Sequence, residues 1–290
     1  MPAQDALLDR IVAHLRGVPG IAAIVLGGSH ARGNATASSD VDLGLYYRAD
    51  VPIDIAALDQ AVQALVDTPR PGLVTPIGAW GPWINGGGWL TVQGQPVDLL
   101  YRDLDRVTQI IEDACAGRLE VAYQPGHPHA FVSSIYLGEI AICRVLWDPD
   151  GALAPLKAQA HPYPPRLQAA TVQRFFWESD FSLQAARKAA LRGDAGYVAG
   201  CCFRTIACLM QVLFALNEQY LLNEKGAVAL AAAFPHTLPA LPARIAAALA
   251  CLNSSPASLT AALDRLAALV DETQGLLEQA GLPHMRQVVR

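Results

Sequence analysis

The spacing of hydrophobic positions changes halfway along the chain. In the first half, short apolar runs alternate with patterns of helical period. The strand-like runs are IAAIVL (21–26), VDLGLYY (41–47), WLTVQ (89–93) and PVDLLY (96–101). The helical patterns cover 6–16, 55–66 and 103–116. This order predicts a sheet covered by helices, with the last two strands forming a hairpin around Gly94.

Long alanine- and leucine-rich stretches dominate the second half, where alternating strand patterns are nearly absent. The predicted helices cover 167–192, 195–221, 241–252 and 258–280. Residues 205–216 (TIACLMQVLFAL) are apolar on almost every side, which predicts a central helix buried by its neighbours.

Turn formers and prolines mark a break between these halves. They gather at DPDG (148–151) and HPYPP (161–165), where both helical and strand patterns stop. We therefore expect two domains, residues 1–150 and 151–290. The expected fold class is α+β, a mixed-sheet domain followed by an all-helical bundle.

Charge narrows the class of protein. The net charge is −5, distributed as −8 over residues 1–150 and +3 over 151–290, and there is no dense run of lysine or arginine. This pattern argues against a nucleic-acid partner and favours small ligands.

Cysteines and apolar segments bear on localisation. The six cysteines have neither C-x-x-C nor paired zinc spacing, so we expect reduced, buried thiols. The first residues lack the basic and apolar regions of a signal peptide. No apolar run is expected to reach the roughly 18 residues that a membrane-spanning helix needs. We therefore expect a cytoplasmic protein without a membrane partner.

The segment LGGSHARGNATASSDVDLGLYY carries the candidate chemistry. After a buried strand, Gly27 and Gly28 allow a tight turn, and Ser29 is then expected to cap a short helix. Backbone N–H groups at such a turn, together with the serine hydroxyl, suit phosphate oxygens.

Three aspartates complete the pattern. Side chains alternate along a strand, so Asp40 and Asp42 point the same way while Val41 and Leu43 point into the core. In PVDLL, the same alternation places Asp98 on the face opposite to its apolar neighbours. Carboxylates at this spacing suit two divalent ions, with Mg²⁺ as the expected metal and Mn²⁺ as an alternative.

These residues resemble the DNA polymerase β-like nucleotidyltransferase superfamily, whose pattern is a strand, Gly-Gly/Ser-Ser, about ten residues and then Asp-hydrophobic-Asp. Within it, the chain looks most like small bacterial two-domain enzymes related to the antibiotic nucleotidyltransferases. The resemblance implies that Asp40, Asp42 and Asp98 are catalytic metal ligands. It also implies transfer of a nucleoside monophosphate, AMP from ATP, to a hydroxyl of a small molecule with release of pyrophosphate.

The same resemblance suggests which residues bind the nucleoside triphosphate. The implied set is Gly27, Gly28, Ser29, Arg32, Ser39 and Lys225. Lys225 lies in YLLNEKG, where related two-domain enzymes present a lysine toward the triphosphate, and it is one of three lysines in the chain. It would act there as a point charge.

Several alternatives remain open from the sequence. A protein hydroxyl as the acceptor would give an AMPylating enzyme, and a silent nucleotide-binding regulatory module would keep the fold without turnover. Reading GGSHA as a nucleophile elbow leaves the aspartates unexplained. Glu178 competes with Asp98 as the general base, although a surface helix position would also explain it. His30 is expected to be solvated, and His127 and His129 form an incomplete metal site.

Overall fold

The computed structural model describes residues 2–33, 35–36 and 39–285. The chain divides into two compact units, one formed by residues 1–112 and 136–162 and the other by 113–135 and 163–290. The division thus differs from the single break expected near residue 150. The reason is that residues 113–135 join the helical unit, and the chain then returns to add a fifth strand to the sheet.

The first unit is built around a five-stranded mixed sheet. Its strands are β1 (Ala23–Leu26), β2 (Val41–Tyr47), β3 (Gly87–Val92), β4 (Gln95–Asp103) and β7 (Arg144–Trp147), in the order β3-β4-β2-β1-β7. Strands β2 and β4 are parallel, and the other neighbours are antiparallel. Positive φ angles at Gln93 and Gly94 close the predicted hairpin between β3 and β4.

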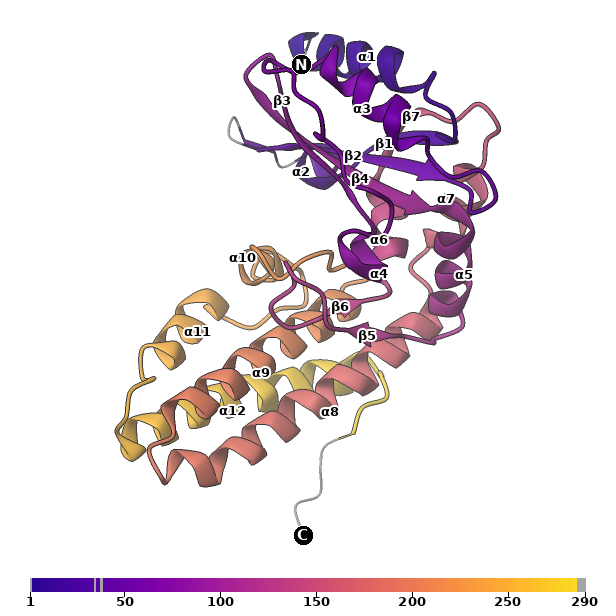
Figure 1. The fold of residues 1–290 in the computed structure, drawn as a ribbon. Helices are drawn as coiled ribbons and strands as arrows, with labels where there is room; N and C mark the ends of the chain where they lie inside the picture. The colour runs from indigo at the N-terminus through magenta and orange to yellow at the C-terminus, as the bar shows by residue number, and fades with distance from the viewer. Residues whose placement is uncertain (1, 34, 37–38, 286–290) are drawn as a thin grey trace. The chain divides into compact units, whose positions relative to one another are not determined.

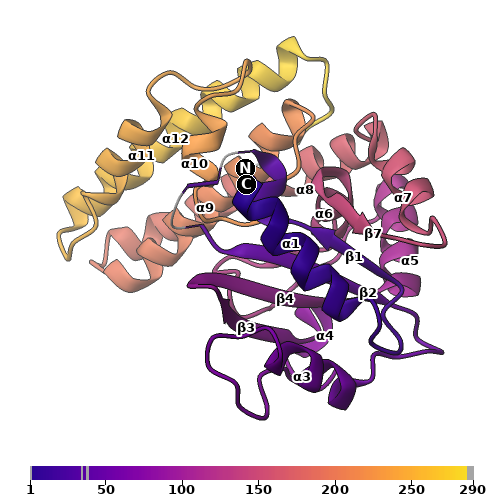
Figure 2. The same ribbon diagram turned by 90° about the horizontal axis from the view of Figure 1, so that it is seen from above.

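Helices cover both faces of this sheet (Figures 1 and 2). On one face, α1 (Pro2–Leu15) and α3 (Ile55–Gln63) pack on the apolar side chains of β2 and β4. On the other lie α4 (Gly81–Ile84) and α6 (Ile135–Ile142), seen below the sheet in Figure 1. The remaining helices of the unit are α2 (Gly28–Arg32), α5 (Leu104–Cys115) and α7 (Leu153–Ala160).

The second unit is a helical bundle with one small two-stranded sheet. Its helices are α8 (Pro165–Ala190), α9 (Ala195–Leu216), α10 (Ala227–Ala231), α11 (Leu241–Leu249) and α12 (Pro256–Gln279). Strands β5 (Val121–Ala122) and β6 (Phe131–Val132) pair antiparallel, so this unit is not all-helical as expected. Proline in the first turn begins α8 and α12, where its missing N–H leaves no acceptor unsatisfied.

Helix α9 is the centre of the bundle, as its apolar pattern predicts. Every residue from 205 to 216 is buried. By length and composition α9 is apolar enough to cross a membrane, which corrects the expectation that no run reaches that length. In this structure 72% of its apolar window is buried inside the protein, as in the core helix of a soluble bundle.

None of the six cysteines, all of which lie in the described part of the chain, forms a disulfide bond. Cys143, Cys202 and Cys208 are buried, whereas the other three are partly exposed.

Candidate active site

The glycine turn lies against β2. The N–H of Gly27 donates to the carbonyl oxygen of Asp42 at 2.8 Å. Helix α2 begins at the next residue with Gly27 as its N-cap, so the expectation that Ser29 caps it is wrong, because Ser29 is already inside the first turn. Gly28 has φ +57°, and a Cβ placed on it would lie 1.7 Å from Oδ2 of Asp42. The turn therefore requires glycine for its backbone conformation and for the space that the carboxylate takes up. The first amides of α2 have no acceptor within the helix, which leaves them available to an anion.

Strand register brings two of the predicted carboxylates together. Asp42 on β2 is the direct partner of Asp98 on the parallel strand β4. Val41 and Leu43 are buried in the core on the α1 side, as are Val97 and Leu99, so both aspartates face the other side of the sheet. Asp40 is exposed just before β2.

The electrostatics place Asp40 in the same cluster. Burial, together with the charges of Asp98 and Asp40, raises the pKa of Asp42 to about 6. Burial also raises the pKa of Asp98, with Asp40 as the second cause. Carboxylates that raise one another's pKa are crowded like charges, which divalent cations relieve.

Ser39, between α2 and β2, is the centre of a group of polar contacts. The carbonyl oxygen of Ser39 accepts a hydrogen bond from Nε2 of Gln95 at 2.8 Å and lies 3.3 Å from Nε2 of His30. Nδ1 of His30 lies 2.6 Å from Nε2 of Gln4, so the imidazole is half-buried in a network and not simply solvated. The hydroxyl of Ser39 accepts from the Thr36 N–H at 2.9 Å.

Two residues of this network, Gln95 and Gln4, were not expected from the sequence. Gln95 could have been found from the hairpin register, which places it at the start of β4 beside the loop that ends at Asp40. Gln4 has no sequence signal, because its contact depends on the packing of α1. Arg32 lies half-buried on α2, where burial lowers the pKa of its guanidinium.

Beyond the aspartates, the same face of the sheet is closed by a buried ion pair. Arg102 on β4 donates through Nε and Nη2 to the two carboxylate oxygens of Glu139 on α6, at 2.8 and 2.7 Å. Burial alone would lower the pKa of Arg102, but Glu139 outweighs it and raises that pKa. The pair fastens α6 to the strand that carries Asp98.

Lys225 belongs to the second unit. It lies in an exposed turn immediately before α10, and its N–H donates to Oδ1 of Asn223 at 2.8 Å. Its assignment to the triphosphate stays a prediction. The preceding residue, Glu224, has a structural contact of its own, because its Oε1 accepts the N–H of His129 at 3.0 Å.

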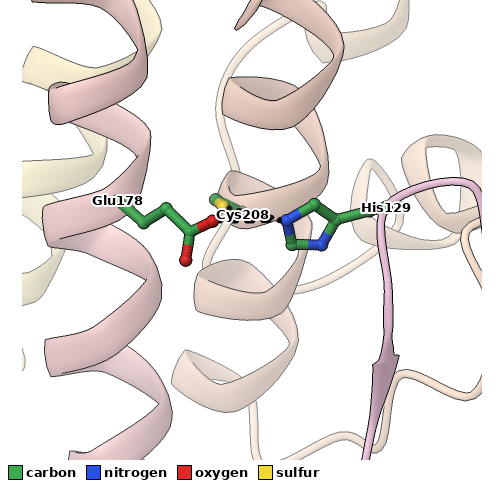
Figure 3. Close-up of side chains that lie close together, drawn as sticks. All are labelled: His129, Glu178 and Cys208. Carbon is green, nitrogen blue, oxygen red and sulfur yellow. Dashed lines mark hydrogen bonds and ion pairs between the residues drawn. The ribbon is translucent and has the colours of Figure 1, made fainter. Parts of the chain in front are cut away.

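Glu178 lies in a buried cluster of the second unit and is not a surface helix residue. Its Oε1 accepts from Nε of Arg204 at 2.5 Å. The same oxygen lies 3.5 Å from Nε2 of His129, which in turn lies 3.8 Å from Sγ of Cys208 (Figure 3). Burial raises the pKa of Glu178, but His129 and Arg204 outweigh this effect and hold it below its ordinary value.

This cluster groups three donors that could hold a metal, although His127 and His129 were expected to form only an incomplete site. The Arg204 guanidinium already neutralises the carboxylate oxygen that a metal would use. We therefore interpret the cluster as an ion-pair network that supports the bundle.

Comparison with known families identifies the class of the first unit. Residues 8–78 match the family described as "Nucleotidyltransferase domain", and residues 132–225 match a second family, "Domain of unknown function (DUF4037)". The first match contains the glycine turn, Asp40 and Asp42, whereas Asp98 lies beyond it. The resemblance inferred from the motif is thus confirmed for residues 8–78, which match a nucleotidyltransferase domain, and the fold class is α+β as expected.

A solved structure shows a more distant similarity. It is the crystal structure of a nucleotidyltransferase-like protein from Exiguobacterium sibiricum, which is 12% identical, with a TM-score of 0.44 over 96% of this chain and 79% of that one. At this level of similarity, the comparison carries no argument about function. No curated protein sequence matches the chain significantly.

Proposed function

We propose that the protein transfers AMP from ATP to a hydroxyl group of a small molecule and releases pyrophosphate. The observation that carries the proposal is the direct pairing of Asp42 with Asp98, beside a glycine turn that approaches Asp42 closely. Nucleotidyl transfer in general follows from the domain family. That ATP is the donor and a small molecule the acceptor goes beyond what the family match supports and is part of the proposal.

The residues present fit a site for divalent cations. Asp40, Asp42 and Asp98 offer the hard oxygen ligands that Mg²⁺ prefers. The pKa values of Asp42 and Asp98 are raised by burial and by repulsion between the carboxylates, and bound cations would offset both effects. When bound, such ions stabilise negative charge on the attacking and leaving oxygens.

The protein's own groups have distinct roles in this reaction. The first amides of α2 and the Ser29 hydroxyl bind triphosphate oxygens, while Arg32 adds positive charge. The acceptor oxygen forms a bond to the α-phosphorus as the bond to the pyrophosphate oxygen breaks. Asp98 accepts the hydroxyl proton, for which its raised pKa suits it. Glu178 is the weaker candidate because Arg204 and His129 bind its carboxylate.

Pyrophosphate release from ATP and Mg²⁺ over a panel of hydroxyl compounds tests the proposal. We expect Asp42→Asn and Asp98→Asn to reduce turnover at least a thousandfold, and Asp50→Asn, which removes an exposed charge of the same unit, to leave it unchanged. Intact mass of each acceptor then identifies the transferred group, an added adenylyl group being the expected result. Unaltered turnover in both active-site variants would reject the proposal.

Two outcomes of this experiment would replace the small-molecule acceptor. A mass increase on a protein, and on none of the small compounds, would indicate an AMPylating enzyme. Binding of ATP without pyrophosphate release throughout the panel would indicate a regulatory module.

A further inference from the structure

Four residues from neighbouring strands form a row across the sheet. Gly27, just after β1, is hydrogen-bonded to Asp42 on β2; Asp42 pairs with Asp98 on β4; and Asp98 pairs with Trp89 on β3. Partners in direct register have their side chains on the same face. The indole of Trp89 therefore lies beside the third carboxylate, on the side away from the glycine turn.

Trp89 is the most exposed tryptophan of the structure's described residues, with 70% of its surface accessible. Its neighbours on β3, Leu90 and Gly88, are buried, so the exposure is limited to the face that it shares with the aspartates. A large aromatic side chain in this position costs free energy by exposing apolar surface to water. A ligand that covers the ring would remove this cost.

The ring is also held in place. Trp80, which precedes α4, stacks on Trp89 with ring centroids 4.5 Å apart and an interplanar angle of 23°. Gly87 lies close to the backbone of β4, because a Cβ there would lie 1.7 Å from the carbonyl oxygen of Leu99, and it also leaves room for Trp80, whose Cζ3 would lie 2.9 Å from that Cβ. Two stacked indoles form a rigid flat surface that loses little conformational freedom on binding.

The order of the row separates the two substrates. If the triphosphate binds at the glycine turn, the attacking hydroxyl must approach from the opposite side of the carboxylates, since attack and departure are in line. That side is the one occupied by Trp89.

We propose that Trp89, supported by Trp80, is the surface on which the acceptor binds, and that the acceptor is a hydroxyl compound with an aromatic or sugar ring that stacks on the indole. This inference rests on the proposed function for the direction of attack. Its own content is the identity of the binding surface and the class of acceptor.

Saturation-transfer NMR tests the binding surface independently of turnover. A panel of aryl alcohols, monosaccharides and open-chain alcohols is added to the full-length protein with Mg²⁺ and ATP. We expect the ring protons of either the aryl alcohols or the monosaccharides to receive saturation from the wild-type protein. The signal should be absent with Trp89→Ala and present with Trp89→Phe, which keeps an aromatic ring. Tyr123→Ala, which removes an exposed aromatic residue of the other unit, serves as the control.

The second measurement is the KM of wild type and Trp89→Ala for any acceptor that is turned over. Trp89→Ala should raise the KM for the acceptor about tenfold or more, as expected for loss of a stacked ring, and leave the KM for ATP within twofold. Pyrophosphate release with an unchanged acceptor KM in Trp89→Ala would overturn this inference while leaving the proposed function intact. Ring binding that depends on Trp89 without turnover would support the surface and reject the proposed reaction. An absence of ring binding to the wild-type protein would overturn the inference.

Discussion

Oδ2 of Asp42 lies where a side chain on Gly28 would have to be, 1.7 Å from the ideal Cβ position. The turn that is expected to bind the triphosphate and the strand that carries the carboxylates are therefore fitted to each other. A substitution at Gly28 therefore tests the geometry of the site directly.

Gly28→Ala should displace Asp42 and destabilise the first unit by about 2 kcal/mol or more, the sum of the positive φ and the overlap with the carboxylate. Gly33→Ala is the matched control, because Gly33 has φ +76° with nothing within 4 Å of its Cβ position. The control should lose only about 1 kcal/mol of stability, the cost of a positive φ for alanine. Thermal unfolding of both variants measures the difference, and equal losses would contradict the overlap.

Asp42→Asn should stabilise the protein at neutral pH in the absence of divalent cations. The folded-state pKa of about 6 lies above the unfolded value of 3.8, so wild-type stability falls as the pH rises through this interval. At pH 7 the variant should gain roughly 1–2 kcal/mol after allowance for solvent screening, and at pH 4 almost nothing. Unfolding in EDTA at both pH values measures this, with Asp50→Asn as the control.

Adding Mg²⁺ should make the wild-type protein more stable than Asp42→Asn, the reverse of their order in EDTA. Cations bound by Asp40, Asp42 and Asp98 would stabilise the wild type by mass action, whereas Asp42→Asn would respond weakly. A wild-type unfolding temperature that is the same with EDTA and with millimolar Mg²⁺ and ATP would argue against the metal site.

Glu139→Gln should destabilise the first unit by about 3 kcal/mol, because it leaves the guanidinium of Arg102 buried without a counter-ion. The matched control is Asp105→Asn, which removes the acid from an exposed pair with Arg48 and should cost less than about 1 kcal/mol. Chemical denaturation gives both values. Similar losses in the two variants would mean that the buried pair contributes no more than a surface one.

Arg204→Ala should destabilise the helical unit by about 1–3 kcal/mol, because the buried Glu178 carboxylate loses its cation. Since the pKa of Glu178 lies below its ordinary value, this contribution is present at neutral pH and is lost as the pH falls below 4.5. Arg187→Ala, from the more exposed pair with Asp264, is the control and should cost under about 1 kcal/mol. A loss that persists unchanged at low pH would contradict the ionic explanation.

Local patterns in the sequence predicted much of the first unit. The alternation in VDLGLYY gave the bounds of β2, and the turn at Gly94 gave the hairpin. The same alternation put Asp42 and Asp98 on the polar side of their strands, and strand pairing then brought them together. The hairpin also sets Trp89 opposite Asp98.

Other features depend on contacts between distant segments. Strand β7 has only four residues and becomes a strand by pairing with β1, so its own pattern is weak. Helix α6 is apolar almost all round, which gives no periodic signal for its buried face. The partners of Glu178 come from a loop and from another helix, and no spacing within the sequence indicates them.

The path of the chain limits how this protein can be dissected. Residues 113–135 belong to the second unit, and the chain then returns to the first unit for residues 136–162. A fragment that ends at 112 therefore lacks the edge strand β7 of its sheet, and a fragment that starts at 163 lacks both short strands of the bundle. A single truncation therefore cannot yield either half intact. Isolated halves would require two segments spliced through an artificial linker, and their refolding would show whether each is an autonomous folding unit.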